Sequence, residues 1–331
     1  MTKPVTAACA AQLVSEGKLD LRAPLSAYIP EFAQPATVRT LKPGSKHKAP
    51  HFPPNAPRND DQPEPEFDYA PARRPITVHD IMSFTSGLQT IMVDNPTIPE
   101  IGPQDTLASH VAKLGGATLE FQPGAQWHYS NVTGYDVLGR LIEIVSGRPF
   151  DRYAQELLFD PLGMKDTGFG LPRKDRGRTL SVGFFEQMPI ARNDYPSGSA
   201  GLWSTAVDYQ HFAQMLLQEG MFGGRRILQP EAVASMHRNQ IGDLPFAGVR
   251  SSQYAQFNAP PQPGIRYGYG VAIIEGASAE PLPTGSFGWD GIGTRRFWVI
   301  PSLDAVLVML MPGLGPHAEP VHREIEAALA T

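Results

Sequence analysis

The amino-acid sequence predicts an α+β fold in which a mainly helical part is followed by an antiparallel sheet and a last helix. Apolar residues recur at helical spacing along much of 1–240, whereas 264–331 contains short strand-like apolar runs. Consecutive strands followed by a helix favour an antiparallel meander. With 331 residues, of which 41% are hydrophobic, the chain can bury a sizeable core. We therefore expect a single domain, 1–331, made of a helical lobe (1–240) and a sheet with its closing helix (264–331).

The first part of the chain is predicted to hold one clear helix and a long loop. Apolar residues at helical intervals over 5–16 predict the helix, and Gly17 ends it. A short turn and helix are expected over 19–32. Residues 33–75 are crowded with proline and polar residues and lack periodicity, so they predict a long surface loop.

The following helices carry start and stop signals. A helix is expected to begin at Ile76, with Thr77 as its cap and Asp80 at its third position, and 84–88 closes it. Three more helices are expected, over 135–145 with Gly147 at its end, over 150–158, and over 204–217.

Beyond a second Pro- and Gln-rich loop at 240–263, the pattern changes to that of strands. The expected strands are 267–274, 286–288, 295–300 and 305–311, and a helix over 322–330 closes the chain.

Composition excludes several classes of protein. The formal net charge of −5 offers no basic face for nucleic acid, and no apolar stretch is long enough to span a bilayer. The single cysteine, Cys9, rules out an internal disulfide and is expected in the core of the first helix. It favours a reducing compartment such as the cytoplasm, while a missing N-terminus would leave a periplasmic or secreted location open. The nine histidines show no metal-binding spacing, so no metal is expected.

The chain begins Met-Thr-Lys-Pro-Val-Thr-Ala-Ala and enters a helical pattern without a cap. Residues i and i+3 share a face of a helix, so a residue directly before Met1 would lie on the same face as Lys3. A serine there could give its proton to Lys3, provided that a desolvated site lowers the pKa of the lysine. Taken alone, a Lys-Pro at a chain start is more often a solvated terminus.

Several further segments follow in a fixed order. They are Ile-Thr-Val-His-Asp-Ile-Met-Ser-Phe-Thr-Ser-Gly-Leu at 76–88, Tyr129-Ser130-Asn131, Phe-Asp-Pro-Leu-Gly-Met-Lys-Asp-Thr-Gly-Phe at 159–169, and Ser-Ala-Gly-Leu-Trp-Ser-Thr-Ala-Val-Asp at 199–208. Together with the first residues they cover nearly the whole chain. The sequence therefore resembles the serine hydrolases of the class C β-lactamase, penicillin-binding protein and related esterase type, and most closely the esterase branch.

The resemblance implies a β-lactamase/transpeptidase-like fold, an active-site helix over 3–16, and hydrolysis through an acyl-enzyme without a cofactor. It makes Lys3 and Tyr129 catalytic, since a phenol held near an ammonium can favour its anionic form and relay a proton. Asn131 would orient Lys3 and the substrate. The plainer alternative is that Tyr129 packs its ring and bonds a backbone carbonyl.

In the third family element, Trp289-Asp290-Gly291 stands where β-lactam-active members have a cation and a hydroxyl. A tryptophan offers one N–H donor and a large apolar face, and Asp290 would repel an anion. A neutral small-molecule ester or amide is therefore expected as substrate. Gly291 would allow close approach of the acyl group, and the Ile292 amide would be one oxyanion donor. The alternative is a tryptophan that plugs a strand edge and an aspartate in a turn.

The family motif requires a serine directly before Met1, so we expect this chain to be truncated just after it, to lack the N-terminal strands of the family and to be inactive as it stands. A sheet edge and an apolar face should then be uncovered and solubility poor. Two alternatives stay open: a catalytically inactive binding protein that keeps the cleft, and a true β-lactamase or D-amino-acid peptidase. The loops at 33–75 and 240–263 are expected to shape substrate choice.

Overall fold

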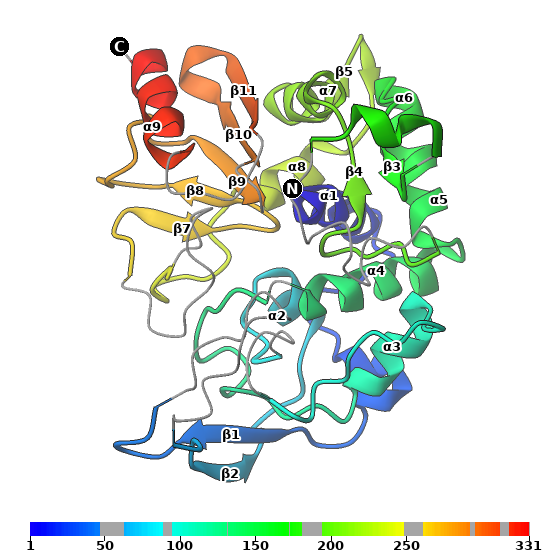
Figure 1. Ribbon diagram of the computed structural model, residues 1–331, viewed down its shortest axis with the longest axis vertical. Coiled ribbons are helices and arrows are strands. Elements are labelled where there is room, and N and C mark those ends of the chain that lie inside the picture. Colours follow the sequence, from blue (N-terminus) through cyan, green and yellow to red (C-terminus); the bar gives the residue numbers. More distant parts are fainter. Residues whose placement is uncertain are drawn as a thin grey trace.

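The computed structural model describes residues 1–46, 63–88, 95–130, 132–171, 173–180, 194–247, 261–291, 295–311 and 318–330. The predicted α+β class is confirmed. One large antiparallel sheet and its covering helix lie on one side of the molecule, the helical lobe lies on the other, and α1 (Thr2–Ser15) runs between them (Figure 1).

The large sheet is the predicted meander. Its order is β11-β10-β9-β8-β7, with every pair antiparallel. The strands are β7 (Ile265–Tyr267), β8 (Ala272–Ile274), β9 (Phe287–Gly291), β10 (Arg295–Ile300) and β11 (Ala305–Leu310). The single strand expected over 267–274 is wrong: it is two strands, because a tight turn that includes Gly270 (φ +81°) reverses the chain.

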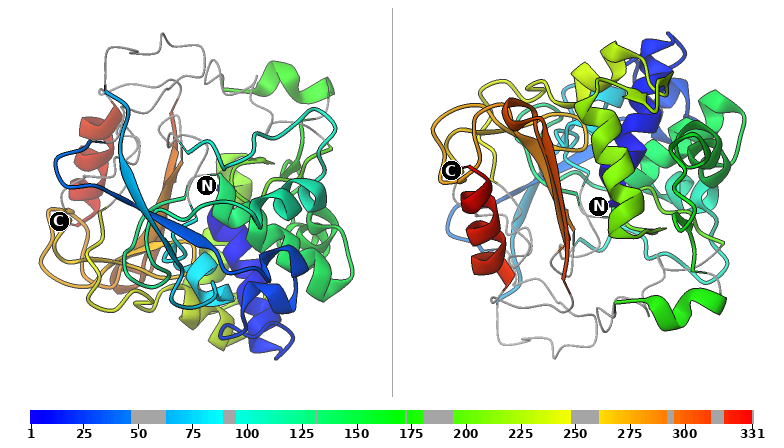
Figure 2. Two further views of the ribbon diagram at one scale, coloured as in Figure 1. Left: turned by 90° about the horizontal axis from the view of Figure 1, so that it is seen from below. Right: turned by 90° about the horizontal axis from the view of Figure 1, so that it is seen from above.

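Helices cover both faces of this sheet. Figure 2 shows α9 (Ala318–Leu329) on one face and α7 (Ala206–Leu217) on the opposite face. β11 ends the strand order, so its outer edge has no strand partner among the described residues. On α9 the apolar residues Val321, Ile325 and Leu329 are about 40% exposed. Within the described residues, β11 thus has an open edge and α9 has an exposed apolar stripe, while the uncovering of the sheet by truncation and poor solubility remain predictions.

α1 is the central helix of the lobe and is buried from Thr2 to Leu13. It packs against α4 (Thr133–Ser146), α5 (Phe150–Ala154) and α8 (Pro230–Met236). A helix that is buried on all sides shows no polar face, and its alanines let neighbouring elements approach closely. Cys9 lies in this core, as predicted, and Gly17 follows the helix end with φ +69°.

The helix starts and ends predicted from capping residues are confirmed at several positions. Thr77 and Asp80 form a capping box at the start of α2 (Val78–Met82). Gly147 ends α4 in the left-handed conformation, and Thr205 caps α7. The helix expected over 150–158 continues as α5, a π-helical turn (Gln155–Phe159) and α6 (Asp160–Leu162).

The secondary structure predicted for 33–75 and 19–32 is wrong. The loop expected over 33–75 contains the antiparallel hairpin β1 (Thr37–Leu41) and β2 (Phe67–Pro71), while 47–62 lies outside the described residues. A buried ion pair between Arg39 and Glu120 ties this hairpin to a distant segment, which no local pattern records. Instead of a helix over 19–32 there are two 3-10 turns, Leu25–Ala27 and Pro30–Phe32, since prolines interrupt the segment.

The remaining elements are short or were not predicted. They are α3 (Leu107–Leu114), β3 (Gly168–Phe169), a 3-10 turn at Arg173–Arg178, β4 (Leu202–Trp203), β5 (Met221–Phe222), β6 (Arg225–Arg226) and a 3-10 turn at Pro301–Leu303. Among the helices described, none has the length and apolar character needed to cross a membrane.

Candidate active site

Lys3 lies in the first turn of α1 and is only 3% exposed. Its Nζ donates a hydrogen bond to the carbonyl oxygen of Ser199, at 3.0 Å. The turn at Gly270 presses against this part of the helix: a Cβ on Gly270 would come within 2.6 Å of the Ala7 Cβ and 3.2 Å of the Lys3 carbonyl oxygen. Only glycine permits this approach, which fixes the helix start against the sheet.

Lys3 meets Tyr129 inside the protein, so it is no solvated terminus. Its Nζ lies 4.8 Å from the centroid of the Tyr129 ring. Desolvation lowers the pKa of Lys3 from 10.5 to about 7, against an opposing effect of the negative charge of Asp136. A buried amine that is partly neutral at pH 7 can accept a proton from a nearby hydroxyl, as the sequence motif requires.

Tyr129 is held by aromatic neighbours from two other segments. Its ring meets Phe84 edge-on at 5.1 Å and Trp289 at 5.4 Å between centroids. Phe84 itself has φ +59°, a strained value for a bulky residue, and its carbonyl oxygen accepts a hydrogen bond from the His128 amide at 3.0 Å. These contacts set the position of the Tyr129 loop at the start of α4.

The expectation of an anionic Tyr129 is wrong for the protein at rest. Burial raises the pKa of Tyr129 above its ordinary value, and a hydrogen bond with the Trp289 indole opposes this only in part. A lysine whose own pKa is near 7 offers little positive charge to stabilise a phenolate. Tyr129 is therefore a neutral phenol at neutral pH, and it can donate a proton.

β9 places Trp289 and Asp290 on opposite faces of the sheet, because side chains alternate along a strand. Asp290 accepts two hydrogen bonds from its cross-strand neighbour Arg296, at 2.7 and 2.9 Å, and Arg296 also binds Glu326 of α9. Asp290 therefore faces α9 within a strand, not in a turn. The expectation that Asp290 repels a substrate anion is wrong, since its charge is paired on the far side of the sheet.

The face that bears Trp289 and Gly291 looks toward α1. A Cβ on Gly291 would come within 2.8 Å of the Met1 backbone nitrogen and 3.5 Å of the Arg295 Cβ. Arg295 pairs with Gly291 across the strands and so shares this face. Arg295 is not among the residues predicted from the sequence, because its place on the same face as Gly291 follows only from the register of β9 and β10.

Two residues of the predicted site, Asn131 and Ile292, lie outside the described residues. The hydroxyls of Ser130 and Ser86 are each engaged in a local hydrogen bond. The Ser130 hydroxyl accepts a hydrogen bond from the Gly134 amide at 3.0 Å, and that of Ser86 accepts one from Leu88 at 3.1 Å. Neither serine has a lysine three residues further on. Within the described part of the chain, no group of three metal-binding side chains occurs.

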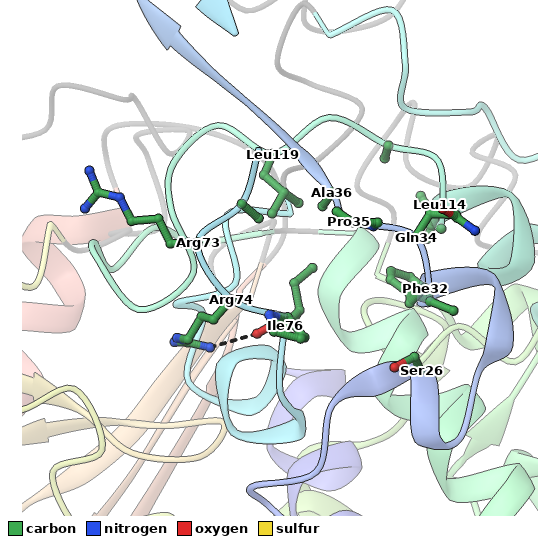
Figure 3. Close-up of a pocket in the computed structure, with 15 residues that line it drawn as sticks. Ser26, Phe32, Gln34, Pro35, Ala36, Arg73, Arg74, Ile76, Leu114 and Leu119 are labelled. Atoms are coloured by element: carbon green, nitrogen blue, oxygen red, sulfur yellow. Dashed lines mark hydrogen bonds between the residues drawn. The ribbon is translucent and has the colours of Figure 1, made fainter. Parts of the chain in front are cut away.

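A separate cavity of about 220 Å³ lies away from Lys3, between residues 32–36, residues 72–76 and the end of α3. Figure 3 shows apolar side chains such as Phe32, Ile76 and Leu119 around it, while the guanidinium groups of Arg73 and Arg74 point away from them. Arg74 is bound to Asp80 through two hydrogen bonds. The cavity contains no catalytic constellation.

The family model described as Beta-lactamase matches residues 1–331. The chain belongs to the β-lactamase family. The resemblance inferred from the sequence is thereby confirmed. A protein of Mycobacterium tuberculosis is 30% identical over 335 residues, which cover 94% of this chain and 75% of that protein.

Two further relatives of this β-lactamase-family serine hydrolase are named esterases, and others are named putative D-alanyl-D-alanine carboxypeptidases. Esterase EstB of Burkholderia gladioli is 25% identical over 346 residues, covering 94% of this chain and 75% of the esterase. Lovastatin esterase of Penicillium rubens is 28% identical over 295 residues, covering 82% of this chain and 67% of that esterase. The solved structure of EstCE1, a hydrolase with promiscuous acyltransferase activity, shares the fold with a TM-score of 0.70 at 22% identity, covering 100% of this chain and 83% of that one.

Proposed function

We propose that this protein is a carboxylesterase-type acyl hydrolase whose nucleophile is a serine directly before Met1. One observation carries the proposal: the buried amine of Lys3 lies against Tyr129, and Tyr129 lies against Trp289. These three residues come from the first helix, a loop 126 positions later and the sheet, as the family motif requires. The esterase relatives support the ester-cleaving branch.

In the proposed reaction the serine oxygen attacks the ester carbonyl carbon, and its proton passes to the neutral amine of Lys3. The tetrahedral intermediate expels the alcohol, whose oxygen takes the phenolic proton of Tyr129 while the Lys3 ammonium returns its proton to Tyr129. Water then attacks the acyl carbon and gives one proton to Lys3. The bond between the serine oxygen and the acyl carbon breaks, and the serine oxygen takes that proton through Tyr129 as the acid leaves. The backbone amides of the serine and of Ile292, beside Gly291, are proposed to bind the oxyanion. Asn131 is proposed to orient Lys3 and the substrate.

A neutral ester is the favoured substrate because Trp289 presents an apolar surface where a cation and a hydroxyl would otherwise hold a carboxylate. One observation favours a second candidate, a substrate that carries an anionic group, as in a β-lactamase or D-amino-acid peptidase. Arg295 pairs with Gly291 on the face of the sheet that bears Trp289, where it donates a hydrogen bond to the Leu180 carbonyl oxygen at 3.1 Å, while the Asp290 carboxylate is paired on the other face. The two candidates differ in what Arg295 does.

The test compares two variants that carry one added residue directly before Met1, a serine or, as the matched control, an alanine. Both are treated with an organophosphonate and weighed by intact-mass spectrometry, and both are assayed with a chromogenic short-chain ester and a chromogenic cephalosporin. We expect labelling and ester turnover in the serine variant alone. Lys3→Ala or Tyr129→Phe in that variant should lower kcat by roughly 10²–10⁴-fold.

Each other outcome counts against the proposal in its own way. Cephalosporin turnover without ester turnover supports the second candidate. A serine variant that folds but shows neither labelling nor turnover supports the catalytically inactive binding protein. Equal labelling of the serine and alanine variants would mean that the nucleophile is elsewhere in the chain.

A further inference from the structure

Asp136 is a buried carboxylate that the proposed mechanism does not use. It lies in the first turn of α4, with 0% exposure. Three donors bind it: the Ser197 hydroxyl at 2.7 Å, the Ser199 amide at 3.0 Å and the Tyr195 hydroxyl at 2.8 Å. Burial raises the pKa of Asp136, and these hydrogen bonds act against that rise. Because an ionised carboxylate is purely an acceptor, three donors fit its charged form.

The hydrogen bonds of Asp136 organise the segment 195–199, which lies between α4 and α1. Gly198 is pressed against α4, since a Cβ there would come within 2.2 Å of the Tyr135 carbonyl oxygen. The carbonyl oxygen of Gly198 accepts a hydrogen bond from the Thr6 hydroxyl of α1, at 2.7 Å. The next carbonyl, that of Ser199, accepts the hydrogen bond from Lys3. The carboxylate is thus connected to the Lys3 amine through a single residue.

We propose that Asp136 is a positioning residue for Lys3: it holds the Ser199 carbonyl in place for the amine, and it supplies a buried negative charge that keeps the amine able to carry a proton. The inference rests on the proposed function in that the amine it concerns is the proposed base. It assigns Asp136 no contact with substrate.

Among the described residues, four further groups near the start of α1 do not replace this charge: the Tyr129 phenol, the Met1 amino group, Asp290 and Arg295. Tyr129 is a neutral phenol at neutral pH. Burial lowers the pKa of the amino group of Met1 to about 5, so this group is uncharged at pH 7. Asp290 of β9 acts on the Met1 amino group, but Arg296 neutralises it, and Arg295 of β10 is itself a cation. Without Asp136, burial alone would press the pKa of Lys3 still lower.

The experiment is an NMR titration of Lys3 in the chain as it stands, which reads the amine whether or not the protein hydrolyses esters. The Cε signal is assigned by its loss in Lys3→Met. We expect the apparent pKa of Lys3 to fall by about one pH unit or more in Asp136→Asn, since a nearby opposite charge shifts a pKa by about 1–3. Glu143→Gln, which removes a carboxylate elsewhere on α4, should leave the apparent pKa of Lys3 unchanged.

A purely structural role is separated by Tyr195→Phe. This variant keeps the carboxylate and removes one donor, so it should lower the melting temperature without moving the Lys3 pKa by more than about 0.3. An unchanged Lys3 pKa in folded Asp136→Asn overturns the proposal. If Asp136→Asn does not fold, the reciprocal measurement decides: the Asp136 carboxyl pKa must rise in Lys3→Met, because coupling between two sites is mutual, and no rise overturns the proposal.

Discussion

Replacing Lys3 with methionine should make the stability of this protein less dependent on pH. Methionine is a straight apolar side chain of similar length and needs no desolvation of a charge. In the folded protein the pKa of Lys3 is lowered from 10.5 to about 7, chiefly by burial. Between these pH values the unfolded chain binds a proton that the folded chain does not. The stability of the parent therefore rises with pH from about 7 to about 10.5, and the full penalty is present below pH 7.

The size of the effect follows from the same shift. At about 1.4 kcal/mol per pH unit, a pKa lowered from 10.5 to about 7 corresponds to roughly 5 kcal/mol, of which about 3 kcal/mol falls between pH 7 and 9. The lost hydrogen bond to the Ser199 carbonyl adds an opposite cost of about 1–3 kcal/mol to the variant. Because that cost varies little with pH, the test depends on how the difference in the free energy of unfolding changes with pH, and not on its absolute value.

Urea denaturation followed by circular dichroism measures the difference in the free energy of unfolding, Lys3→Met minus parent, at several pH values from about 6 to about 9. We expect the advantage of the variant to be largest at the acidic end and to shrink with rising pH. Lys18→Met, at a side chain that is 59% exposed and ion-paired with Glu16, is the reference for loss of a surface ammonium. A Lys3 difference that is constant over this range refutes the reasoning that Lys3 is a buried base.

Three further outcomes are expected. Gly270→Ala should lower the free energy of unfolding, measured by urea denaturation, by at least about 2 kcal/mol more than Gly285→Ala does. Both glycines have a positive φ, but only at Gly270 would a Cβ meet α1, whereas a Cβ at Gly285 meets nothing within 4 Å. Equal losses would contradict the close packing of the Gly270 turn against α1. Arg296→Met should lower stability by about 3–5 kcal/mol, and adding Glu326→Gln should restore part of it; additive losses would argue against a coupled network. In the serine-extended protein, Arg295→Ala should lower kcat/KM for the anionic cephalosporin about tenfold more than for the neutral ester, and equal losses would remove Arg295 as an anion contact.

Much of the site could be foreseen because its members lie in local patterns. The helix start around Lys3, the cap at Thr77, and the strand that bears Trp289 each depend on residues within a few positions of one another, and such signals survive in any tertiary setting. The order of these segments along the chain indicated the family. That they meet in space is a fact of the fold, since Lys3 lies 4.8 Å from the Tyr129 ring and Tyr129 contacts Trp289.

The predictions that the structure contradicts have a common physical cause, which is dependence on contacts between residues far apart in sequence. The sequence predicts that Asp290 faces the substrate, but the face on which a strand residue lies depends on the register and on its cross-strand partner, here Arg296. The sequence predicts a loop where β1 and β2 pair, because the ion pair of Arg39 and Glu120 that ties this hairpin to the rest of the fold joins residues far apart in sequence.

The sequence by itself determined the class of fold, the elements with strong end signals and the identity of the candidate catalytic side chains. Tertiary structure alone decided their chemical state. Desolvation brings the Lys3 amine toward neutrality and keeps Tyr129 protonated, and Asp136 acts on that amine through a segment sixty positions further along the chain. A pKa depends on every group packed around it, and those groups are assembled only when distant parts of the chain come together.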